Sequence, residues 1–170
     1  VPGGFGDRGI EGMITTAKYC REHDIPYLGI CLGMQIAVIE FARHVCGLAD
    51  ANSGEFSKTS EHKIIDFLPD QSETIDKGAT LRLGAYPCHI LPGTRMHECY
   101  GCDEIRERHR HRYEFNNDFR GDFTDAGMRL AGLSPDGTLV EIVESKSHPW
   151  FVGAQFHPLF KALVESSLKK

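Results

Sequence analysis

Apolar residues in the first fifty positions of the chain follow two different spacings. The first set is Ile10, Met13, Ile14, Ala17 and Cys20. Its three-and-four spacing predicts a helix with one buried face, ending near His23. The short apolar run 27–30 follows Ile25-Pro26 and is typical of a buried parallel strand. Segment 32–45 is apolar on almost every side, which predicts a helix enclosed within a layered domain.

Short β patterns dominate the remainder of the chain. Residues 52–76 are polar and turn-rich, and only 63–67 within them resembles a strand. Further strands are predicted at 80–83, 88–91, 108–115, 128–133, 139–143 and 150–156, and a short amphipathic helix at 160–168. Turn pairs such as Asp136-Gly137 separate these strands. This order of elements predicts one α/β domain over residues 1–170.

Composition narrows the class of ligand. Of the 170 residues, 41% are hydrophobic and 25% are charged, which suits a globular domain with a sizeable core. The net charge of -5 argues against binding to nucleic acid or to an anionic membrane, so we expect a small ligand. No apolar run or leader pattern indicates a membrane or secreted protein, and we expect a cytoplasmic one. Because the chain begins at Val1 with a loop that normally follows a strand, we expect it to be N-terminally truncated.

Six cysteines are scattered through the chain, and a domain of this size does not need disulfides, so we expect reduced thiols. Cys99 and Cys102 have the spacing of a zinc knuckle. A structural zinc site needs four ligands, however, and the sequence contains no second pair at a suitable spacing. We therefore expect no metal site.

One cysteine stands out by its neighbours. Cys31 lies in Gly29-Ile30-Cys31-Leu32-Gly33, between a predicted strand and a predicted helix. This is the layout of a nucleophile elbow, where small residues permit a sharp turn that exposes the central side chain. The helix N-terminus is expected to lower the pKa of such a thiol. The alternative is that Cys31 packs in the core, as most free cysteines do, and the pattern alone leaves both interpretations open.

Two further segments fit nucleophilic catalysis. The glycine-rich loop 2–6 can present backbone N–H groups to a developing oxyanion. His157 ends the apolar strand predicted at 150–156 and is the best partner for Cys31 as general base and acid. Taken singly, an ordinary turn and a structural histidine explain these two features equally well.

Taken in order, six segments resemble the class I glutamine amidotransferases, and among them the glutaminase domain of the CTP synthases. They are PGGFG followed by RG and EGM, GICLGMQ, ANSGEF, LRLG, ERHRHRYE and QFHP, and together they cover nearly the whole chain. GxCxG alone would indicate only the superfamily, whereas ERHRHRYE with ANSGEF is specific to CTP synthases. The resemblance implies a mixed central sheet with flanking helices and a Cys-His-Glu triad.

The resemblance also implies roles for individual residues. Cys31 would be the nucleophile and His157 the acid and base, and the N–H groups of Gly4 and Leu32 would form the oxyanion hole. The residues implied to bind glutamine are Gly4, Phe5, Leu32, Gly33, Met34, Gln35, Glu55, Arg112 and Tyr113. Glu55 would lie near the α-amino group and Arg112 near the α-carboxylate, and these charges suit a zwitterionic amino acid.

Partners follow from the same resemblance. The substrate would be L-glutamine, and the ammonia would pass to the parent enzyme's own N-terminal synthetase domain, where ATP and magnesium activate UTP for conversion to CTP. GTP would be an allosteric effector, and this domain itself would need no cofactor. The resemblance implies a homotetramer for the full-length enzyme, and we expect a monomer or weak dimer for the fragment.

Arginine and histidine alternate in the run 108–112. In a strand this alternation sends the arginines to one face and the histidines to the other. The run could be a solvated basic stretch or a nucleic-acid patch, but Glu104, Glu107 and Glu114 offset its charge. An anionic small molecule suits it better.

The sequence departs from the family pattern at the triad glutamate, because His157-Pro158 is followed by Leu159. We favour the explanation that the glutamate and its loop are missing from the printed sequence, so that Leu159 already belongs to the final helix. A real deletion would leave an impaired glutaminase, or a regulatory module that binds without catalysis. A hydrolase of γ-glutamyl peptides is a third option, which Glu55 and Arg112 disfavour because they would bind a free amino-acid head.

Overall fold

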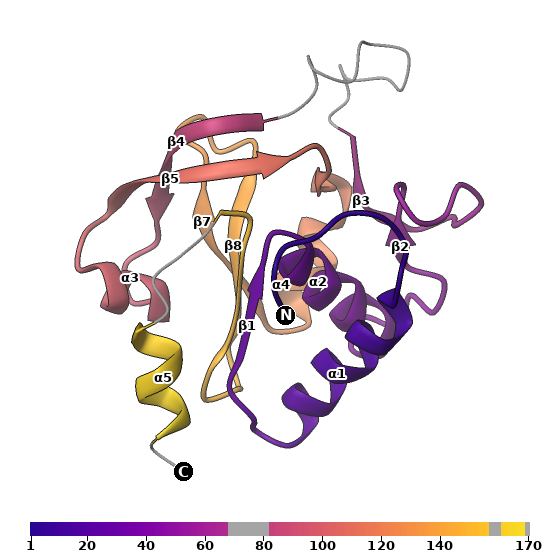
Figure 1. The fold of residues 1–170 in the computed structure, drawn as a ribbon, viewed down its shortest axis with the longest axis horizontal. Helices are drawn as coiled ribbons and strands as arrows, with labels where there is room; N and C mark the ends of the chain where they lie inside the picture. The colour runs from indigo at the N-terminus through magenta and orange to yellow at the C-terminus, as the bar shows by residue number, and fades with distance from the viewer. Residues whose placement is uncertain (68–81, 157–160, 169–170) are drawn as a thin grey trace.

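The computed structural model describes residues 1–67, 82–156 and 161–168, with the side chains of all of these except residues 161 and 162 (Figure 1). A six-stranded mixed sheet lies at its centre, in the order β1-β9-β8-β7-β4-β5. These strands are β1 (Tyr27–Ile30), β4 (Arg82–Ile90), β5 (Glu104–His111), β7 (Met128–Leu133), β8 (Val140–Ser145) and β9 (Phe151–Ala154). β1 and β9 pair in parallel, and the other neighbours are antiparallel. The mixed central sheet predicted from the resemblance is confirmed.

A second, smaller sheet has three short strands. They are β2 (Asn52–Ser53), β3 (Lys63–Asp66) and β6 (Glu114–Phe115). β2 runs parallel to β3, and β3 runs antiparallel to β6. Because β6 follows β5 after two residues, the chain passes from one sheet to the other over Arg112 and Tyr113.

Helices cover both faces of the large sheet. They are α1 (Ile10–Glu22), α2 (Leu32–His44), α3 (Arg95–Tyr100), α4 (Arg120–Asp125) and α5 (Lys161–Ser167), with a 3-10 turn, η1, at Asn117–Phe119. In Figure 1, α1, α2 and α4 lie on one side of the sheet and α3 and α5 on the other. None of the helices in the described part of the chain has the length and apolar character needed to cross a membrane.

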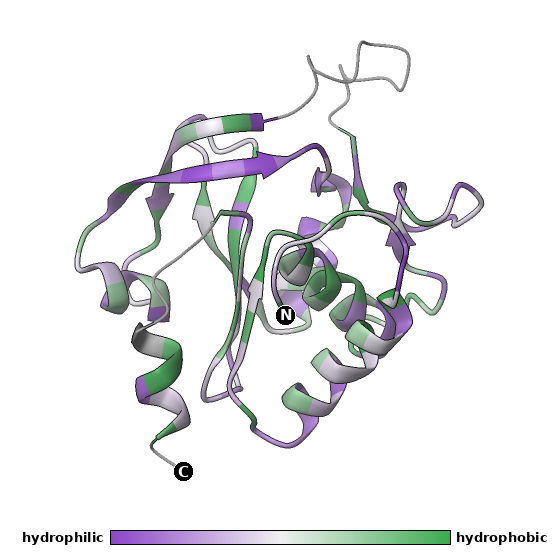
Figure 2. Cartoon of the chain, viewed as in Figure 1, coloured by the Kyte–Doolittle hydropathy of each residue, from purple (hydrophilic) through white to green (hydrophobic). Residues whose placement is uncertain are grey.

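The hydrophobic core has two parts, one on each face of the sheet. On one face α2 is buried from Leu32 through Ala42, and it packs with α1, α4 and β3. Figure 2 shows this helix as mainly hydrophobic, whereas α1 also carries hydrophilic residues. On the other face Met96 of α3, Trp150 and Leu163 of α5 pack against the strands. The apolar pattern of segment 32–45 therefore indicated its enclosed position correctly.

The structure corrects several predicted element boundaries. Segment 108–115 is not one strand, because it divides at Arg112 into β5 and β6. The strand predicted at 88–91 extends back to Arg82, and the part of the 80–83 prediction before Arg82 lies outside the described residues. Pro87 is tolerated within β4 because only β5 pairs with the strand at that position. The sequence analysis missed α3 and α4, since six residues are too few for a helical period to show.

Candidate active site

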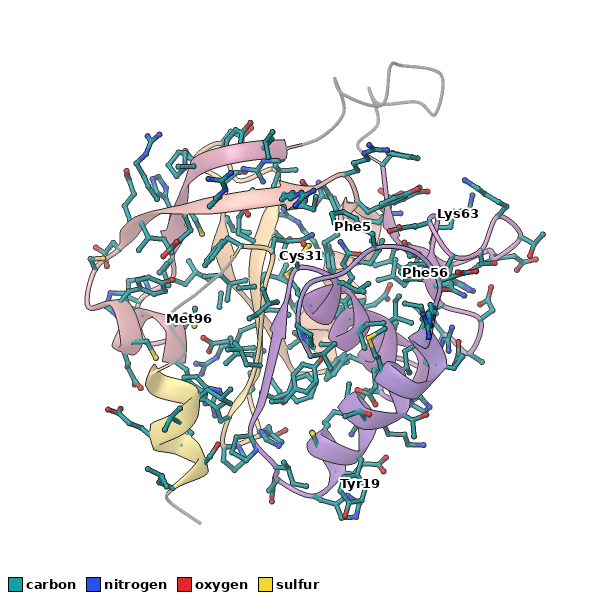
Figure 3. The ribbon with its side chains drawn as sticks, viewed as in Figure 1. Phe5, Tyr19, Cys31, Phe56, Lys63 and Met96 are labelled. Carbon is teal, nitrogen blue, oxygen red and sulfur yellow. The ribbon has the colours of Figure 1, made fainter. Side chains whose placement is uncertain are left out.

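Cys31 occupies a sharp turn between β1 and α2, where its backbone adopts φ 52° and ψ -106° (Figure 3). A positive φ is strained for a residue with a side chain and needs support from its surroundings. The Cys31 N–H donates to the carbonyl oxygen of Ala154 at 2.7 Å, and the Cys31 carbonyl accepts from the N–H of Gln35 at 3.1 Å. These two bonds hold the elbow between β9 and the first turn of α2.

Glycine is required on both sides of this elbow because the backbone approaches too closely for a side chain. A Cβ added at Gly29 would lie 2.4 Å from the carbonyl oxygen of Gly33. A Cβ added at Gly33 would lie 2.1 Å from the carbonyl oxygen of Val1. The hydroxyl of Tyr27 also donates to the Gly33 oxygen at 2.8 Å. The nucleophile-elbow interpretation of GxCxG is therefore confirmed as local geometry.

A cavity of about 330 Å³ lies in front of the sulfur. Its lining residues are Gly4, Phe5, Cys31, Gln35, Glu55, Arg110, His111, Arg112 and Tyr113. Seven of these were nominated from the sequence, and they come from four separate segments of the chain. The Cys31 thiol donates to the carbonyl oxygen of Arg110 at 3.8 Å. Cys31 is only 6% exposed and belongs to the apolar cluster around β1 and β9, but it also lines this polar cavity.

Three nominated residues lie behind the elbow and do not line this cavity. Leu32 directs its backbone N–H toward the Cys31 sulfur. Gly4 sits close to it, since a Cβ added at Gly4 would be 3.0 Å from Leu32 Cδ2. Gly33 and Met34 continue into α2, and the fully buried Met34 side chain packs against Gly153. The Met34 side chain therefore does not line the cavity, and the role in substrate binding that the resemblance implied for Met34 stays a prediction.

Charged groups of both signs surround the cavity. Glu55 accepts a hydrogen bond from the N–H of Gly6 at 3.0 Å, which fixes the carboxylate against the N-terminal loop. Arg112 lines the same cavity from segment 110–113. Arg110, which the sequence analysis did not nominate, places its guanidinium 5.6 Å from the centre of the Phe5 ring. The alternation in 108–112 was the available signal, because it puts Arg108 and Arg110 on the exposed face.

The thiol is not activated by its immediate surroundings. Burial raises the pKa of Cys31, the Leu32 N–H acts in the opposite direction, and the carboxyl groups of Glu55 and Glu114 add to the rise. The lowered pKa expected from the helix N-terminus is therefore wrong for this arrangement, because desolvation outweighs the favourable N–H group. A thiol in this state needs a base to take its proton.

His157, the nominated base, lies outside the described residues, as do Pro158 and Leu159. The described chain leads toward the thiol, because β9 pairs in parallel with β1 and ends at Ala154 opposite Ile30. Two neighbouring parallel strands bring their carboxyl ends to the same edge of a sheet. Gln155, the next residue, donates from Nε2 to the carbonyl oxygen of Tyr113 at 3.1 Å.

Metal binding has one geometric candidate in the described part of the chain. Potential ligand atoms of His109, His111 and Glu141 lie within 4.8 Å of one another, and all three residues are buried. Arg82 Nη1, however, lies 2.6 Å from Glu141 Oε1 and already supplies a positive charge. We therefore interpret the group as an internal ion-pair network, and no set of three ligands among the described residues includes Cys99 or Cys102.

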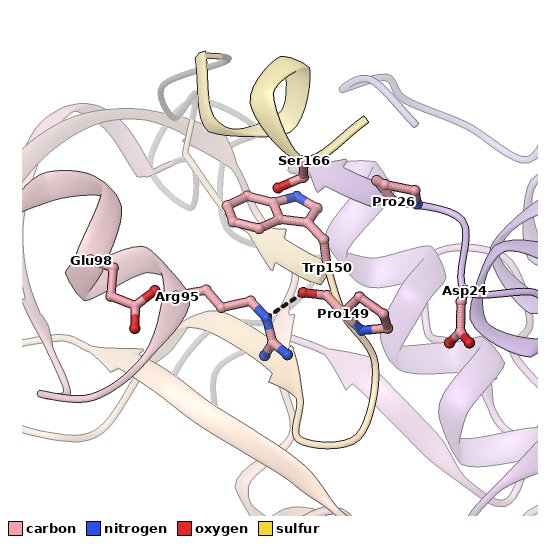
Figure 4. Close-up of a pocket in the computed structure, with 7 residues that line it drawn as sticks. All are labelled: Asp24, Pro26, Arg95, Glu98, Pro149, Trp150 and Ser166. Carbon is pink, nitrogen blue, oxygen red and sulfur yellow. Dashed lines mark hydrogen bonds between the residues drawn. The ribbon is translucent and has the colours of Figure 1, made fainter. Parts of the chain in front are cut away.

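A larger cavity, of about 460 Å³, lies at the other ends of β1 and β9 (Figure 4). It is lined by Asp24, Pro26, Arg95, Glu98, Pro149, Trp150 and Ser166. The Nε of Arg95 donates to the Pro149 carbonyl at 2.7 Å, so this side chain holds a loop in place. Among the described residues, no cysteine or histidine lines this cavity, so the Ser166 hydroxyl there has no histidine base beside it.

Comparisons with known proteins agree with this geometry. The model of the family described as glutamine amidotransferase class-I matches residues 1–165. CTP synthases of Moorella thermoacetica and Roseiflexus castenholzii are 64% and 60% identical to the chain over 95% and 97% of its length. The chain spans about 30% of the length of these curated relatives.

Solved structures give the same result for the fold. The Trypanosoma brucei CTPS glutaminase domain with bound acivicin superposes with a TM-score of 0.92 and 37% identity, covering 100% of this chain and 70% of that one. A glutamine amidotransferase from Thermotoga maritima shares the fold at a TM-score of 0.57 and 17% identity, covering 91% of this chain and 53% of that one. This chain therefore belongs to the class I glutamine amidotransferase family, and within it to the glutaminase domains of the CTP synthases.

Proposed function

We propose that this chain hydrolyses L-glutamine to glutamate and ammonia through a thioester on Cys31. The observation that carries the proposal is the Cys31 elbow, which lines a cavity together with Glu55 and Arg112. A free amino acid needs one anion and one cation to bind its head group. Gln35 and Tyr113 complete the walls between the head group and the thiol.

Substrate orientation follows from the positions of these charges. The α-amino group of glutamine would pair with Glu55 and its α-carboxylate with Arg112, so that the side-chain carboxamide reaches toward the sulfur. An ammonium group beside Glu55 also offsets the carboxylate that helps to raise the pKa of the thiol. Bound substrate therefore favours the reactive thiolate.

The chemistry then proceeds in two steps. The Cys31 sulfur forms a bond to the carboxamide carbon, and the oxyanion is held by the N–H groups of Gly4 and Leu32. The C–N bond breaks as His157 transfers the thiol's proton to the leaving ammonia, which leaves a γ-glutamyl thioester. Water, deprotonated by His157, attacks the thioester, and the carbon–sulfur bond breaks to release glutamate and the free thiol.

The surrounding enzyme is part of the proposal. The ammonia would serve a synthetase domain of the parent protein, where ATP and magnesium activate UTP for conversion to CTP, with GTP as an effector and a homotetramer as the assembly. The identity to CTP synthases over 95% of this chain supports this assignment. We also propose a cytoplasmic location, which the six free cysteines support because disulfides form in oxidising compartments.

A second candidate is a catalytically impaired module that binds glutamine or a partner. The sequence His157-Pro158-Leu159 favours it, because the family's triad glutamate is not at position 159. Loss of the orienting member costs roughly 10⁴-fold in a serine triad, and a cysteine triad is less dependent on it. The two candidates differ in turnover but not in the fold.

One experiment separates them. The chain is incubated with L-glutamine, and the released ammonia is measured with a coupled dehydrogenase. A second sample is treated with a chloroketone analogue of glutamine, and mass spectrometry identifies the labelled cysteine. A glutaminase releases ammonia and carries one label on Cys31, and Cys31→Ser loses both. An impaired module takes the label without turnover, and Leu159→Glu then restores ammonia release. Labelling of Cys31 no faster than of the other five thiols contradicts the glutaminase and favours a module that does not bind glutamine.

A further inference from the structure

Behind the cavity wall, four buried ionisable side chains and the partly buried Arg82 form a closed ring of contacts. They are Arg82, His109, His111, Glu114 and Glu141. Their strands are β4, β5, β6 and β8, so the ring joins the large sheet to the small one. Buried ionisable groups are costly unless they are paired, so a ring of five in one place calls for a function.

The contacts can be followed around the ring. Arg82 Nη1 lies 2.6 Å from Glu141 Oε1 and 3.7 Å from Glu114 Oε1. Glu114 Oε1 lies 3.3 Å from His111 Nδ1, and His111 Nε2 lies 2.8 Å from His109 Nδ1. His109 Nδ1 lies 3.4 Å from Glu141 Oε2, which closes the circuit. Each member therefore touches two others, and displacing one affects its neighbours.

The ring supports the part of the backbone that the active site uses. His111 belongs both to the ring and to the lining of the cavity. Segment 110–113 carries the carbonyl of Arg110, which accepts from the Cys31 thiol. It also carries the carbonyl of Tyr113, which accepts from Gln35 at 3.3 Å and from Gln155 at 3.1 Å. The ring contacts this segment on the side away from the cavity, and the thiol and the proposed substrate contact it on the cavity side.

With both histidines neutral, the charges within the ring balance only if one carboxyl group stays protonated. Arg82 provides one positive charge for the two carboxyl groups of Glu114 and Glu141. Burial raises the pKa of Glu114 to about 8, against the opposing effect of Arg82 and with a further rise from Glu141. Burial also lowers the pKa of His111 to about 3, and Arg82 contributes to this lowering. At neutral pH the ring therefore has a neutral Glu114 and a neutral His111.

We propose that Glu114 and His111 are positioning residues for the glutaminase site, which hold segment 110–113 in its substrate-binding position only while Glu114 is protonated. This inference rests on the proposed function for the identity of the substrate. Ionisation places an uncompensated negative charge against the wall and repels the incoming α-carboxylate. Other charged or titratable groups around the ring are Cys31, Glu55, Arg110, Arg112 and Tyr113 at the cavity, Tyr86 on β4, Asp66 on β3 and Asp136 before β8.

The test compares the KM for glutamine of wild type, Glu114→Gln and His111→Asn between pH 6 and pH 9. If only the protonated form of the site binds, the apparent affinity falls in proportion to the fraction protonated. The wild-type KM should then rise about tenfold between pH 7 and pH 9. Glu114→Gln, which stays neutral, should match wild type at pH 7 and show no such rise. The α-amino group of glutamine titrates equally in both proteins, so the ratio of the two KM values isolates Glu114.

His111→Asn removes the ring contacts at the wall and should raise KM about tenfold at pH 7 with a smaller change in kcat. Glu104→Gln is the matched control, because it makes the same substitution on β5 at a side chain that is 60% exposed. Its KM should follow wild type at every pH. Circular dichroism of each variant confirms folding, and Glu114→Gln remains informative if His111→Asn does not fold.

A second readout separates this inference from the proposed function. The glutamine concentration that halves the alkylation rate of Cys31 by iodoacetamide reports binding whether or not turnover follows. If wild type releases no ammonia but this concentration shows the pH dependence that Glu114→Gln removes, hydrolysis fails and the positioning role stands. If Glu114→Gln parallels wild type at every pH in both readouts, the positioning role is overturned.

Discussion

Replacing Glu114 with glutamine should change how the stability of the fold depends on pH. Glu114 is 2% exposed, and burial raises the pKa of its carboxyl from 4.5 to about 8. The unfolded chain therefore releases this proton near pH 4.5, whereas the folded chain keeps it until about pH 8. Between these values the folded state binds the extra proton, so rising pH lowers the stability of the wild-type protein. Glutamine has the same shape and does not titrate.

The size of the effect follows from the width of that window. Each pH unit within this window lowers the free energy of unfolding of the wild-type protein by about 1.4 kcal/mol. Over the whole window the loss is on the order of 5 kcal/mol. Below pH 4.5 the two proteins should differ little, because both carry a neutral group at this position. By pH 8 the variant should have gained several kcal/mol relative to wild type.

Urea unfolding followed by circular dichroism at pH 5, 6, 7 and 8 measures this difference directly. His111, whose pKa burial lowers to about 3, adds stability to both proteins as pH rises toward 6.5, so it cancels in the comparison. A difference in unfolding free energy that stays constant from pH 5 to pH 8 would refute the reasoning. It would mean that Glu114 ionises in the folded protein at an ordinary pH.

Three further substitutions test the elbow and the substrate site, and a fourth serves as a control. Gly29→Ala places a Cβ 2.4 Å from the Gly33 oxygen and should lower the free energy of unfolding, measured in urea, by about 3 kcal/mol or more. The control Gly12→Ala, on the open face of α1, should raise the free energy of unfolding by about 0.5–1 kcal/mol. Tyr27→Phe removes the hydroxyl bonded to Gly33 and should lower the unfolding free energy by about 1–3 kcal/mol; an unchanged value would show that this bond contributes nothing. Arg112→Gln should raise the glutamine KM roughly 10- to 100-fold with little effect on kcat, and a loss confined to kcat in ammonia-release assays would place Arg112 elsewhere.

Local features of the chain were predictable from the sequence. The helical spacing before His23 and the all-round apolar segment 32–45 predicted α1 and α2, because each depends on neighbours three and four positions away. The glycines around Cys31 predicted the elbow, since a side chain at Gly29 would meet the Gly33 backbone within the turn itself, although the crowding at Gly33 comes from the distant Val1. Family resemblance identified Glu55 and Arg112, which no local spacing connects to Cys31.

Contacts between distant segments were decided only by the tertiary structure. The sequence showed alternating arginine and histidine in 108–112, but it did not show which groups the histidines contact. In the structure His109 and His111 are buried beside carboxyl groups from β8 and β6. The pKa of Cys31 is another case, because the helix N-terminus is a local feature whereas burial by the rest of the fold is not. Local geometry is set by short-range sterics that the sequence displays directly. Burial and charge balance depend on which strands pair, and only the folded chain brings those residues together.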